Sequence, residues 1–470
     1  MITTLLAASL MLSCNPKEIL EPTSFENSII SYVSGDTTMP KKITKTSEFK
    51  KYDSPSIANS IVVQDTFIVF KGVKLHGTPT KESDLTNLKN MKDSELKLKS
   101  LQYVAVGSSL TAGVRDGGYF NEGLLTAYPE LIARQLNLKD FESPVFESAD
   151  YSGIGRKVKA NYNPTAGPVQ KFAIVTNNTA FESYDTIKKQ PKLKKSKAKY
   201  EDFNNLALPE MRFDYYDYKN SKRGQELYLE RFSDKTDYLK HTKKYDFFTY
   251  EAGSSDYSSL GSAEASALDL RPTGILQGQS YIRKFLNHVS SKNMKGVFLN
   301  MPDHSSFPGH KQIPCSVIKA NSMGIIDYKC LSGYYNAIDS RADSLASPIV
   351  NINFKTNGWP SPNKEGKYVG EVGGFAKSNA VTYYNPRIEQ EINLYGYPIV
   401  KLDVLFDKIL AGQYVTNDGV KVNPDWKTGN FFSEDGFFPT AFGQAIIANE
   451  VLKVINSHYK TNIPLIPTRE

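Results

Sequence analysis

The feature that most constrains the fold is a short apolar run that leads through a glycine-serine turn into a helix. Residues Tyr103 to Val106 are apolar without alternation, which is typical of a strand buried inside a parallel sheet. Gly107 ends the run, and residues 128–138 carry apolar side chains at helical spacing. A strand, a turn and a helix in this order form the repeating unit of doubly wound α/β domains.

Similar units recur later in the chain. We expect further strands at 245–250 and 295–300, and helices at 275–289 and 439–459. Pro439 suits the first turn of the last helix, where a missing N–H is tolerated. The sequence therefore predicts an α/β domain with a parallel sheet.

Composition divides the chain into a tether and a main domain. Residues 15–98 are rich in polar residues and are predicted to be a tether, with alternation at 60–74 that indicates a possible small β element of one or two strands. The main domain is expected at 99–470. Two polar insertions within it, at about 156–244 and 308–396, are expected to decorate the sheet rather than to build it.

The first fourteen residues are typical of an export signal. Leu5 to Leu12 form a short apolar stretch, Ser13 is a small residue at the cleavage point, and Cys14 follows. This end resembles a bacterial lipobox, which implies a lipid on Cys14 and attachment to a membrane. No Lys or Arg precedes the apolar stretch, so a short leader with an unmodified cysteine stays open as the alternative.

The other two cysteines, Cys315 and Cys330, lie fifteen positions apart. An oxidising envelope compartment would allow them to form a disulfide, and two free thiols are the alternative. No spacing typical of metal ligands links them to the six histidines, so no metal site is expected.

Hydropathy argues against a membrane-spanning protein, and the distribution of charge argues against a nucleic-acid-binding protein. No stretch after the N-terminus approaches the ~18 apolar residues that a membrane-spanning helix needs. The net charge of +7 comes from one run of seven lysines between Lys188 and Lys199, so it does not indicate a nucleic-acid partner. The run is expected to be a solvated loop, with contact to anionic lipid or acidic polymer as the alternative.

The turn after the first strand suits a nucleophile. A serine between a strand end and a helix start lies where backbone N–H groups and the helix dipole stabilise negative charge, although glycine-serine turns are also common without any function. Four blocks extend the pattern in order: GSSLTAG (107–113), YSGIG (151–155), GSSD (253–256) and DGFFPTAFGQAIIAN (435–449).

Taken together, these blocks resemble the SGNH or GDSL hydrolases, most closely their bacterial envelope lipoprotein branch, over about residues 101–459. The resemblance implies a flavodoxin-like three-layer α/β/α sandwich with a parallel sheet. It also implies Ser109 as the nucleophile and Asp435 as the acid of the triad, with Phe438 at the histidine position. The implied oxyanion-hole residues are Ser109, Gly153, Gly155 and Ser255.

Three positions depart from the family pattern. Ser108 replaces the acid of the first block, Ser255 replaces an asparagine donor, and Phe438 replaces the histidine. A phenyl ring cannot accept the proton of an attacking serine, so the third change is the severe one. His304 is the least implausible substitute base. We expect Phe438, Phe437 and Phe442 to pack apolar surface instead.

The sequence therefore indicates two alternative functions. The first is an esterase-fold lipoprotein, anchored through Cys14 in the cell envelope and expected at the outer membrane, that binds a ligand or an envelope protein partner without efficient catalysis. The second is an active ester hydrolase or acyl transferase on lipid or acetylated glycan that uses Ser109 with a relocated base. Neither requires a cofactor.

Overall fold

The computed structural model describes part of the chain. The described residues are 83–159, 172–176, 178–185, 190–209, 211, 226–232, 245–251, 272–303, 307–308, 384–425, 429–433 and 435–469, with the short strands 62–63, 68–70, 73–74, 313–314 and 334–335.

The centre of the molecule is a parallel sheet. Its four strands are β4 (Tyr103–Val106), β9 (Phe247–Glu251), β10 (Lys295–Leu299) and β13 (Ile399–Val400), in the order β13-β10-β9-β4. All three neighbouring pairs are parallel. The described residues of these strands are buried on both sides, apart from Lys295 and the partly buried Ile399, which explains why they form apolar runs without alternation.

A fifth segment, 204–206, extends the sheet beyond β4. The Ala105 N–H donates to the Asn204 carbonyl at 2.9 Å, and the Leu206 N–H donates to the Ala105 carbonyl at 2.9 Å. The pairing at Ala105 and Asn205 is parallel. Counted in chain order, the sheet then runs 2-1-3-4-5, which is the order of flavodoxin-like doubly wound domains.

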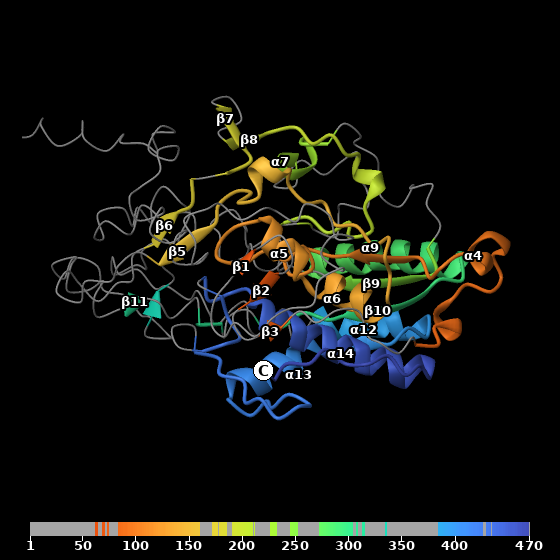
Figure 1. The fold of residues 1–470 in the computed structure, drawn as a ribbon. Coiled ribbons are helices and arrows are strands. Elements are labelled where there is room, and N and C mark those ends of the chain that lie inside the picture. Colours follow the sequence, from red (N-terminus) through yellow and green to blue (C-terminus); the bar gives the residue numbers. More distant parts are fainter. Residues whose placement is uncertain are drawn as a thin grey trace, which may run out of the picture.

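Helices cover both faces of the sheet and make three layers (Figure 1). On one face lie α6 (Tyr128–Gln135), α13 (Leu402–Leu410) and α14 (Ala441–Tyr459). On the other face lie α9 (Pro272–Ser291) and α12 (Asn385–Leu394). In Figure 1, β9 and β10 run between α9 above and α14 below. The predicted three-layer α/β/α fold is confirmed.

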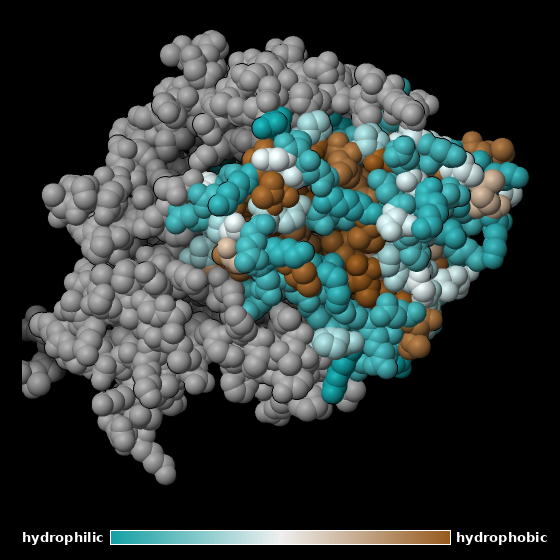
Figure 2. Space-filling view, turned by 90° about the horizontal axis from the view of Figure 1, so that it is seen from below, coloured by the Kyte–Doolittle hydropathy of each residue, from teal (hydrophilic) through white to brown (hydrophobic). Residues whose placement is uncertain are grey.

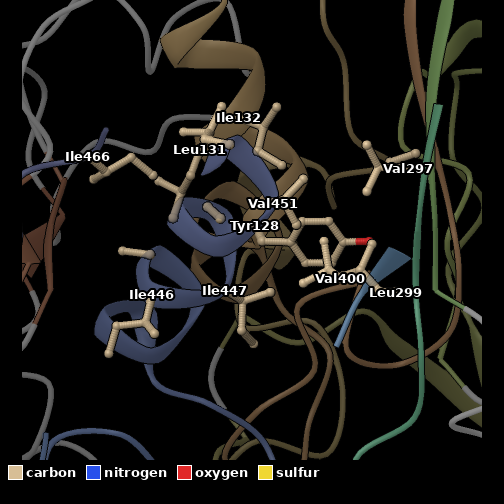
Figure 3. Close-up of a cluster of buried hydrophobic side chains, with 14 of the residues drawn as sticks. Tyr128, Leu131, Ile132, Val297, Leu299, Val400, Ile446, Ile447, Val451 and Ile466 are labelled. Atoms are coloured by element: carbon tan, nitrogen blue, oxygen red, sulfur yellow. The ribbon is translucent and has the colours of Figure 1, made fainter. Parts of the chain in front are cut away.

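The core on the α14 side is mainly aliphatic. Figure 3 shows side chains of α6 and α14 pointing at those of β10 and β13. Tyr128, Ile132, Val297 and Ile447 are all fully buried or nearly so. Truncating one such aliphatic side chain typically costs about 2–5 kcal/mol, so this contact fixes α6 and α14 on the sheet.

The core on the α9 side is aromatic. Phe248 of β9 makes edge-to-face contacts with Phe285 of α9, at 5.2 Å between ring centroids, and with Phe298 of β10, at 5.3 Å. Gly296 leaves the space that the Phe248 ring occupies, because a Cβ at this position would lie 2.2 Å from a carbon of that ring. The glycine in β10 is therefore required by packing rather than by backbone angles.

Smaller elements surround the sandwich. Strands β1 (Val62–Val63), β2 (Ile68–Phe70) and β3 (Val73–Lys74) form an antiparallel sheet, one strand more than the prediction for residues 60–74. Three hairpins are β5 (Lys157–Lys159) with β6 (Phe172–Ile174), β7 (Phe181–Asp185) with β8 (Gln190–Leu193), and β11 (Ile313–Pro314) with β12 (Tyr334–Tyr335). The remaining helices described are α4 (Ser94–Leu98), α5 (Asn121–Leu125) and α7 (Glu226–Leu229), with 3-10 turns at Thr86–Leu88, Ser148–Asp150 and Tyr200–Asp202.

The structure differs from the sequence predictions in two respects. Residues 204–206 and helix α12 lie in the two insertions, yet they belong to the sheet and to a helical layer, so the insertions do more than decorate the sandwich. The last helix begins at Ala441 rather than at Pro439. The Thr440 side chain accepts a hydrogen bond from the Gly443 N–H, and this N-cap sets the start of α14.

The described lysines of the 188–199 run lie at the surface next to acceptors. Lys192 forms an ion pair with Glu182 at 2.8 Å, and Lys194 forms one with Asp150 at 2.6 Å. The described lysines are exposed to solvent as predicted, but the run is not a loop throughout, because Lys192 lies in strand β8. Among the residues that the structure describes, none of the helices is long and apolar enough to cross a membrane.

The contact between Gly296 and Phe248 gives a first prediction. Gly296→Ala forces the Phe248 ring to move within a packed aromatic core, so we expect the free energy of unfolding to fall by about 1–3 kcal/mol. Urea denaturation measures this change. Ser290→Ala, on the exposed side of α9, is the control and should change stability by less than about 0.5 kcal/mol. Equal effects of the two variants would contradict the packing argument.

Candidate functional site at the carboxyl ends of β4 and β9

The order of the strands locates the candidate site. In doubly wound sheets, ligands bind outside the carboxyl ends of the strands where the strand order reverses. In this sheet the reversal lies between β4 and β9, because the chain leaves β4 for segment 204–206 on one side and later returns to β9 on the other. The turn of residues 107–113 and Glu251 lie at this point.

The turn that follows β4 coils tightly. The Ser108 carbonyl accepts the Ala112 N–H at 2.8 Å, and the Ser109 carbonyl accepts the Val114 N–H at 2.9 Å. Gly107 permits this shape, since a Cβ there would lie 2.1 Å from Thr111 Oγ1. The first helix after the turn, α5, begins only at residue 121. The helix predicted after this turn at 128–138 is present as α6, and the short helix α5 lies between the turn and α6.

Glu251, the last residue of β9, holds the turn. Its Oε2 accepts the Thr111 hydroxyl at 2.8 Å and the backbone N–H groups of Ser108 and Thr111 at 3.2 Å each. The Ser108 hydroxyl donates to Oε1 at 3.0 Å. The carboxylate is 2% exposed, so these donors replace the water that the charge would otherwise need. Sequence reasoning missed Glu251, although an acid at the end of a buried apolar strand is a detectable signal.

Two amide side chains fix the turn from other directions. Asn205, in the edge segment, donates from Nδ2 to the Thr111 carbonyl at 3.3 Å and accepts the Ala207 N–H at 3.2 Å. Gln444 of α14 donates to the Leu110 carbonyl at 3.1 Å. The same side chain accepts the N–H of Tyr128 at 3.0 Å, which joins the turn to α6. Ser109 therefore lies in a turn that is fixed by hydrogen bonds to β9, to the edge segment of the sheet and to α14, which is itself bonded to α6.

Asp435 is buried, and its carboxylate accepts hydrogen bonds from backbone N–H groups. One carboxylate oxygen accepts the N–H groups of Phe437 at 2.7 Å and Phe438 at 2.8 Å, and the other accepts the Gly117 N–H at 3.0 Å. Burial raises the pKa of Asp435 to about 6; these hydrogen bonds lower it in part, and the nearby Asp116 raises it further. Ser433 joins the same two segments by accepting the Asp116 N–H at 3.1 Å.

The three phenylalanines near Asp435 pack apolar surface, as expected. Phe438 packs against an apolar cluster that includes Ala112, within the turn of residues 107–113, and Val114, directly after it. Phe437 and Phe442 pack into the aliphatic core on the α14 side. The position that the family resemblance assigns to a histidine is therefore occupied by a ring in apolar contact.

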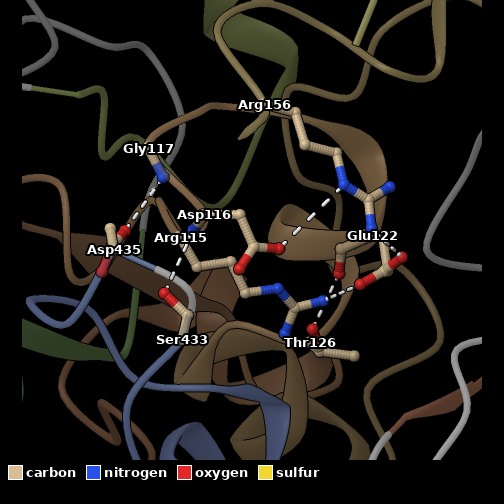
Figure 4. A network of polar contacts seen from close by, with 8 residues as sticks. All are labelled: Arg115, Asp116, Gly117, Glu122, Thr126, Arg156, Ser433 and Asp435. Atoms are coloured by element: carbon tan, nitrogen blue, oxygen red, sulfur yellow. Dashed lines mark hydrogen bonds and ion pairs between the residues drawn. The ribbon is translucent and has the colours of Figure 1, made fainter. Parts of the chain in front are cut away.

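A network of buried charges lies beside Asp435 (Figure 4). Arg115 forms an ion pair with Glu122, and Arg156 lies 3.5 Å from the other oxygen of Glu122 and 4.0 Å from Asp116. The guanidinium group of Arg156 also stands over the Phe120 ring, at 4.4 Å from its centroid. These contacts connect the hairpin at 115–118, which touches Asp435, to the loop that carries Gly153 and Gly155.

The two glycines of that loop differ in their hydrogen bonds. The Gly153 N–H donates to the Asp150 carbonyl at 2.8 Å, and a Cβ there would lie 1.9 Å from the Tyr119 carbonyl oxygen. Its N–H is therefore already used within the loop. No hydrogen bond to a described residue uses the Gly155 N–H. Of these two glycines, Gly153 alone donates a backbone hydrogen bond to a described residue.

The described histidines lie away from Ser109. His288 is in the last turn of α9, just before β10. His458 is next to Tyr459, whose hydroxyl accepts the Gly296 N–H near the start of β10. Both therefore lie at the amino end of the sheet, opposite the turn. The other predicted residues lie outside the described part of the chain: His76, His241, His304, His310, Ser255, Cys14, Cys315 and Cys330.

The described residues offer no metal centre, because no group of three or more His, Cys, Asp or Glu side chains among them is arranged to hold an ion. The site instead presents a serine turn, buried carboxylates and two arginines.

Comparisons with known proteins give little further information. No family model matches the chain, and no curated protein matches it. Among solved structures, the crystal structure of an acetyl xylan esterase, AlAXEase, is similar with a TM-score of 0.31 and 12% identity, over 76% of this chain and 100% of that one. A similarity this low carries no argument, so the fold rests on the observed order of the strands.

The Glu251 contacts give a second prediction. Glu251→Gln replaces an acceptor oxygen by an amide group that faces the N–H donors of Ser108 and Thr111. We expect the free energy of unfolding to fall by about 1–3 kcal/mol, measured by urea denaturation. Glu201→Gln, at a surface ion pair with Lys199, is the matched control and should cost less than about 1 kcal/mol.

Ser108→Asp completes the test. A second carboxylate beside buried Glu251 is strongly unfavourable, whereas in the Glu251→Gln background it supplies the missing acceptor. The aspartate should therefore destabilise the Glu251→Gln variant less than the wild type, and a double-mutant cycle measures the difference. Strictly additive effects would mean that the two side chains do not share one hydrogen-bond site.

The raised pKa of Asp435 gives a third prediction. The folded protein holds this proton up to a pH of about 6, while an unfolded carboxyl loses it near its ordinary pKa of 3.8. The contribution to stability is therefore full below about pH 4 and is lost as the pH rises towards 6. The stability of the wild type relative to Asp435→Asn should fall by about 2.4 kcal/mol between pH 4 and pH 7, measured by urea unfolding. A difference that does not change with pH would contradict the raised pKa.

Proposed function

We propose that this chain is an SGNH or GDSL esterase-fold lipoprotein of the bacterial cell envelope that binds a ligand or a protein partner without efficient ester hydrolysis. The observation that carries the proposal is the position of Phe438. Its ring packs against the cluster that contains Ala112 and Val114, next to the Ser109 turn, where the family resemblance assigns the proton-accepting histidine.

The chemistry of ester cleavage makes this change decisive. A serine hydroxyl needs a base that takes its proton during attack and returns it to the leaving group. A phenyl ring has no lone pair for this transfer. In serine hydrolases, loss of the histidine lowers turnover by a factor on the order of 10⁶, equivalent to about 8 kcal/mol of barrier.

Asp435 is a poor replacement for the missing base. Its two oxygens already accept three backbone N–H groups, from Gly117, Phe437 and Phe438, and these bonds hold the carboxylate in place. Rotating it towards Ser109 would leave those buried N–H groups without acceptors. Each N–H group left without an acceptor costs about 1–3 kcal/mol. The contacts of Asp435 therefore indicate a structural role.

Other features support a binding role for the same turn. Glu251, Asn205 and Gln444 hold the turn in one shape, and a rigid turn is as useful for recognising a ligand as for catalysis. The resemblance of the first fourteen residues to a lipobox supports attachment to the envelope through a lipid on Cys14. Recognition of an ester, an acetylated glycan or an envelope protein at this site is consistent with both features.

The alternative is an active ester hydrolase or acyl transferase that uses Ser109 with a base from elsewhere in the chain. A rigid turn around Ser109 also favours this function. The two functions differ in one measurable property, which is whether Ser109 reacts as a nucleophile.

The decisive experiment restores the missing base. We expect the wild-type protein to show no Ser109-dependent labelling by a fluorophosphonate probe and no turnover of para-nitrophenyl acetate that Ser109→Ala abolishes. Phe438→His should raise turnover by roughly tenfold or more, and Ser109→Ala in that background should remove the gain. Phe437→His, one position away, is the matched control and should bring no gain.

The outcomes separate the two functions. Ser109-dependent turnover by the wild type would refute the binding proposal and assign the chain to the active hydrolases. Gain of activity in Phe438→His alone would support the proposal, since it means that only the base is missing. If Phe438→His and Phe437→His are equally inactive, Phe438 is not the change that removes hydrolysis, and the observation that carries the proposal is overturned.

A further inference from the structure

A cavity of about 270 Å³ lies on the α9 side of the sheet, away from the Ser109 turn. It is bounded by strands β4 and β9, by the last turns of α9, and by α4 with the residues just before it. Its apolar lining consists of buried side chains that belong to the core of this face: Val104, Val106, Leu206, Phe248, Phe285 and Val289. The cavity therefore offers a partly apolar space beside the core of this face.

The polar lining of this cavity is rich in cationic groups. Lys92 and Lys292 are exposed lining residues, and Lys92 Nζ lies 2.9 Å from Asn293 Oδ1. Asp93 is the only acid among the lining residues, and one of its oxygens accepts the N–H groups of Glu95 and Leu96 at the start of α4. The lining therefore combines an apolar interior with a net positive charge.

The surface around α4 continues this pattern. Leu98 is 88% exposed and Met91 is 49% exposed, so both side chains add apolar surface beside α4. Lys89 donates to the carbonyls of Lys97 and Lys99 and thereby closes the loop around α4. Figure 2 shows hydrophobic surface at the end of the molecule where Figure 1 places α4. Four lysines and two acids, Asp93 and Glu95, lie within residues 89–99.

We propose that the cavity binds the acyl chain of an anionic amphiphile, with the anionic head at Lys92 and Lys292. The volume is slightly below the ~300 Å³ at which pockets for drug-sized ligands begin, which suits a single chain better than a ring system. Burying each methylene of such a chain is favourable, and the two lysines select a negative head over a positive one. The exposed Leu98 and Met91 are placed to contact the surface of a lipid layer from which the chain enters.

This inference does not depend on the proposed function. The cavity and the Ser109 turn use different residues, and Lys92 and Lys292 contact neither Glu251 nor Asp435 in any described interaction. The two proposals can therefore fail separately.

Titration of the full-length protein with decanoate tests the cavity, with heat of binding as the readout. We expect saturable binding, weakened by about tenfold in the double variant Lys92→Glu with Lys292→Glu. The double variant Lys408→Glu with Lys421→Glu, at exposed lysines outside the cavity, is the matched control and should bind like the wild type. Decyltrimethylammonium, which has the same chain and a cationic head, should bind about tenfold more weakly than decanoate.

Two results would overturn the proposal. One is the absence of decanoate binding to the wild type. The other is equal binding of decanoate by the wild type and by the Lys92 and Lys292 double variant, which changes only exposed side chains and should fold normally. Val289→Phe adds a steric test, because the larger ring fills the cavity; if this variant is folded and still binds decanoate, the chain does not enter here.

The acyl chain could come from a membrane lipid or from a free fatty acid, and binding to vesicles distinguishes these two sources. Co-sedimentation with phosphatidylglycerol vesicles but not with phosphatidylcholine vesicles, lost in Leu98→Asp and kept in Leu394→Asp, would assign the acyl chain to a membrane lipid. Leu394 is a suitable control because it is 73% exposed on a different helix, α12. Decanoate binding without vesicle binding would assign a free fatty acid. Vesicle binding without decanoate binding would overturn the cavity as the site.

Discussion

The structure depends on one buried carboxylate that joins its two central strands. Glu251 ends β9, yet its hydrogen-bond partners belong to the turn that follows β4. A buried charge without partners costs several kcal/mol, so the Ser108 and Thr111 donors must stay in place as long as the protein is folded. The shape of the turn is consequently fixed by an electrostatic requirement, and Ser109 occupies a defined position whether or not it reacts.

The sequence predicted the elements whose signal is local. Strands β4 and β10 and helix α14 were recognisable because burial on both sides of a parallel sheet produces continuous apolar runs and because helices repeat every 3.6 residues. Segment 204–206 could not be found in this way. It joins the sheet through backbone groups of Ala105, and two of its three side chains are asparagines, so no apolar run marks it.

The candidate site was predictable only in part. Ser109, Asp435 and Phe438 could be identified from their spacing within short motifs. Glu251 is visible in the sequence as an acid at the end of an apolar strand, but its partners are not, because Ser108 lies 143 positions away along the chain. The environment of Phe438 also required the fold, since its contact with the cluster around Ala112 arises from packing between the two ends of the domain. The two proposed sites lie at different parts of β4. The Ser109 turn follows its carboxyl end, and the cavity lies along its α9 face.

The distance in sequence between β4 and its partners has a consequence for biosynthesis. Both strands that flank β4 come late, at 204–206 and at Phe247–Glu251. A ribosome releases the N-terminal part first, so the apolar run at Tyr103–Val106 waits without neighbours until about half of the protein has emerged. Long-range pairing of this kind folds slowly, because the entropy of closing the loop is lost before contacts compensate it. During that interval the apolar strand is exposed, and an unpaired strand of this kind is prone to aggregate.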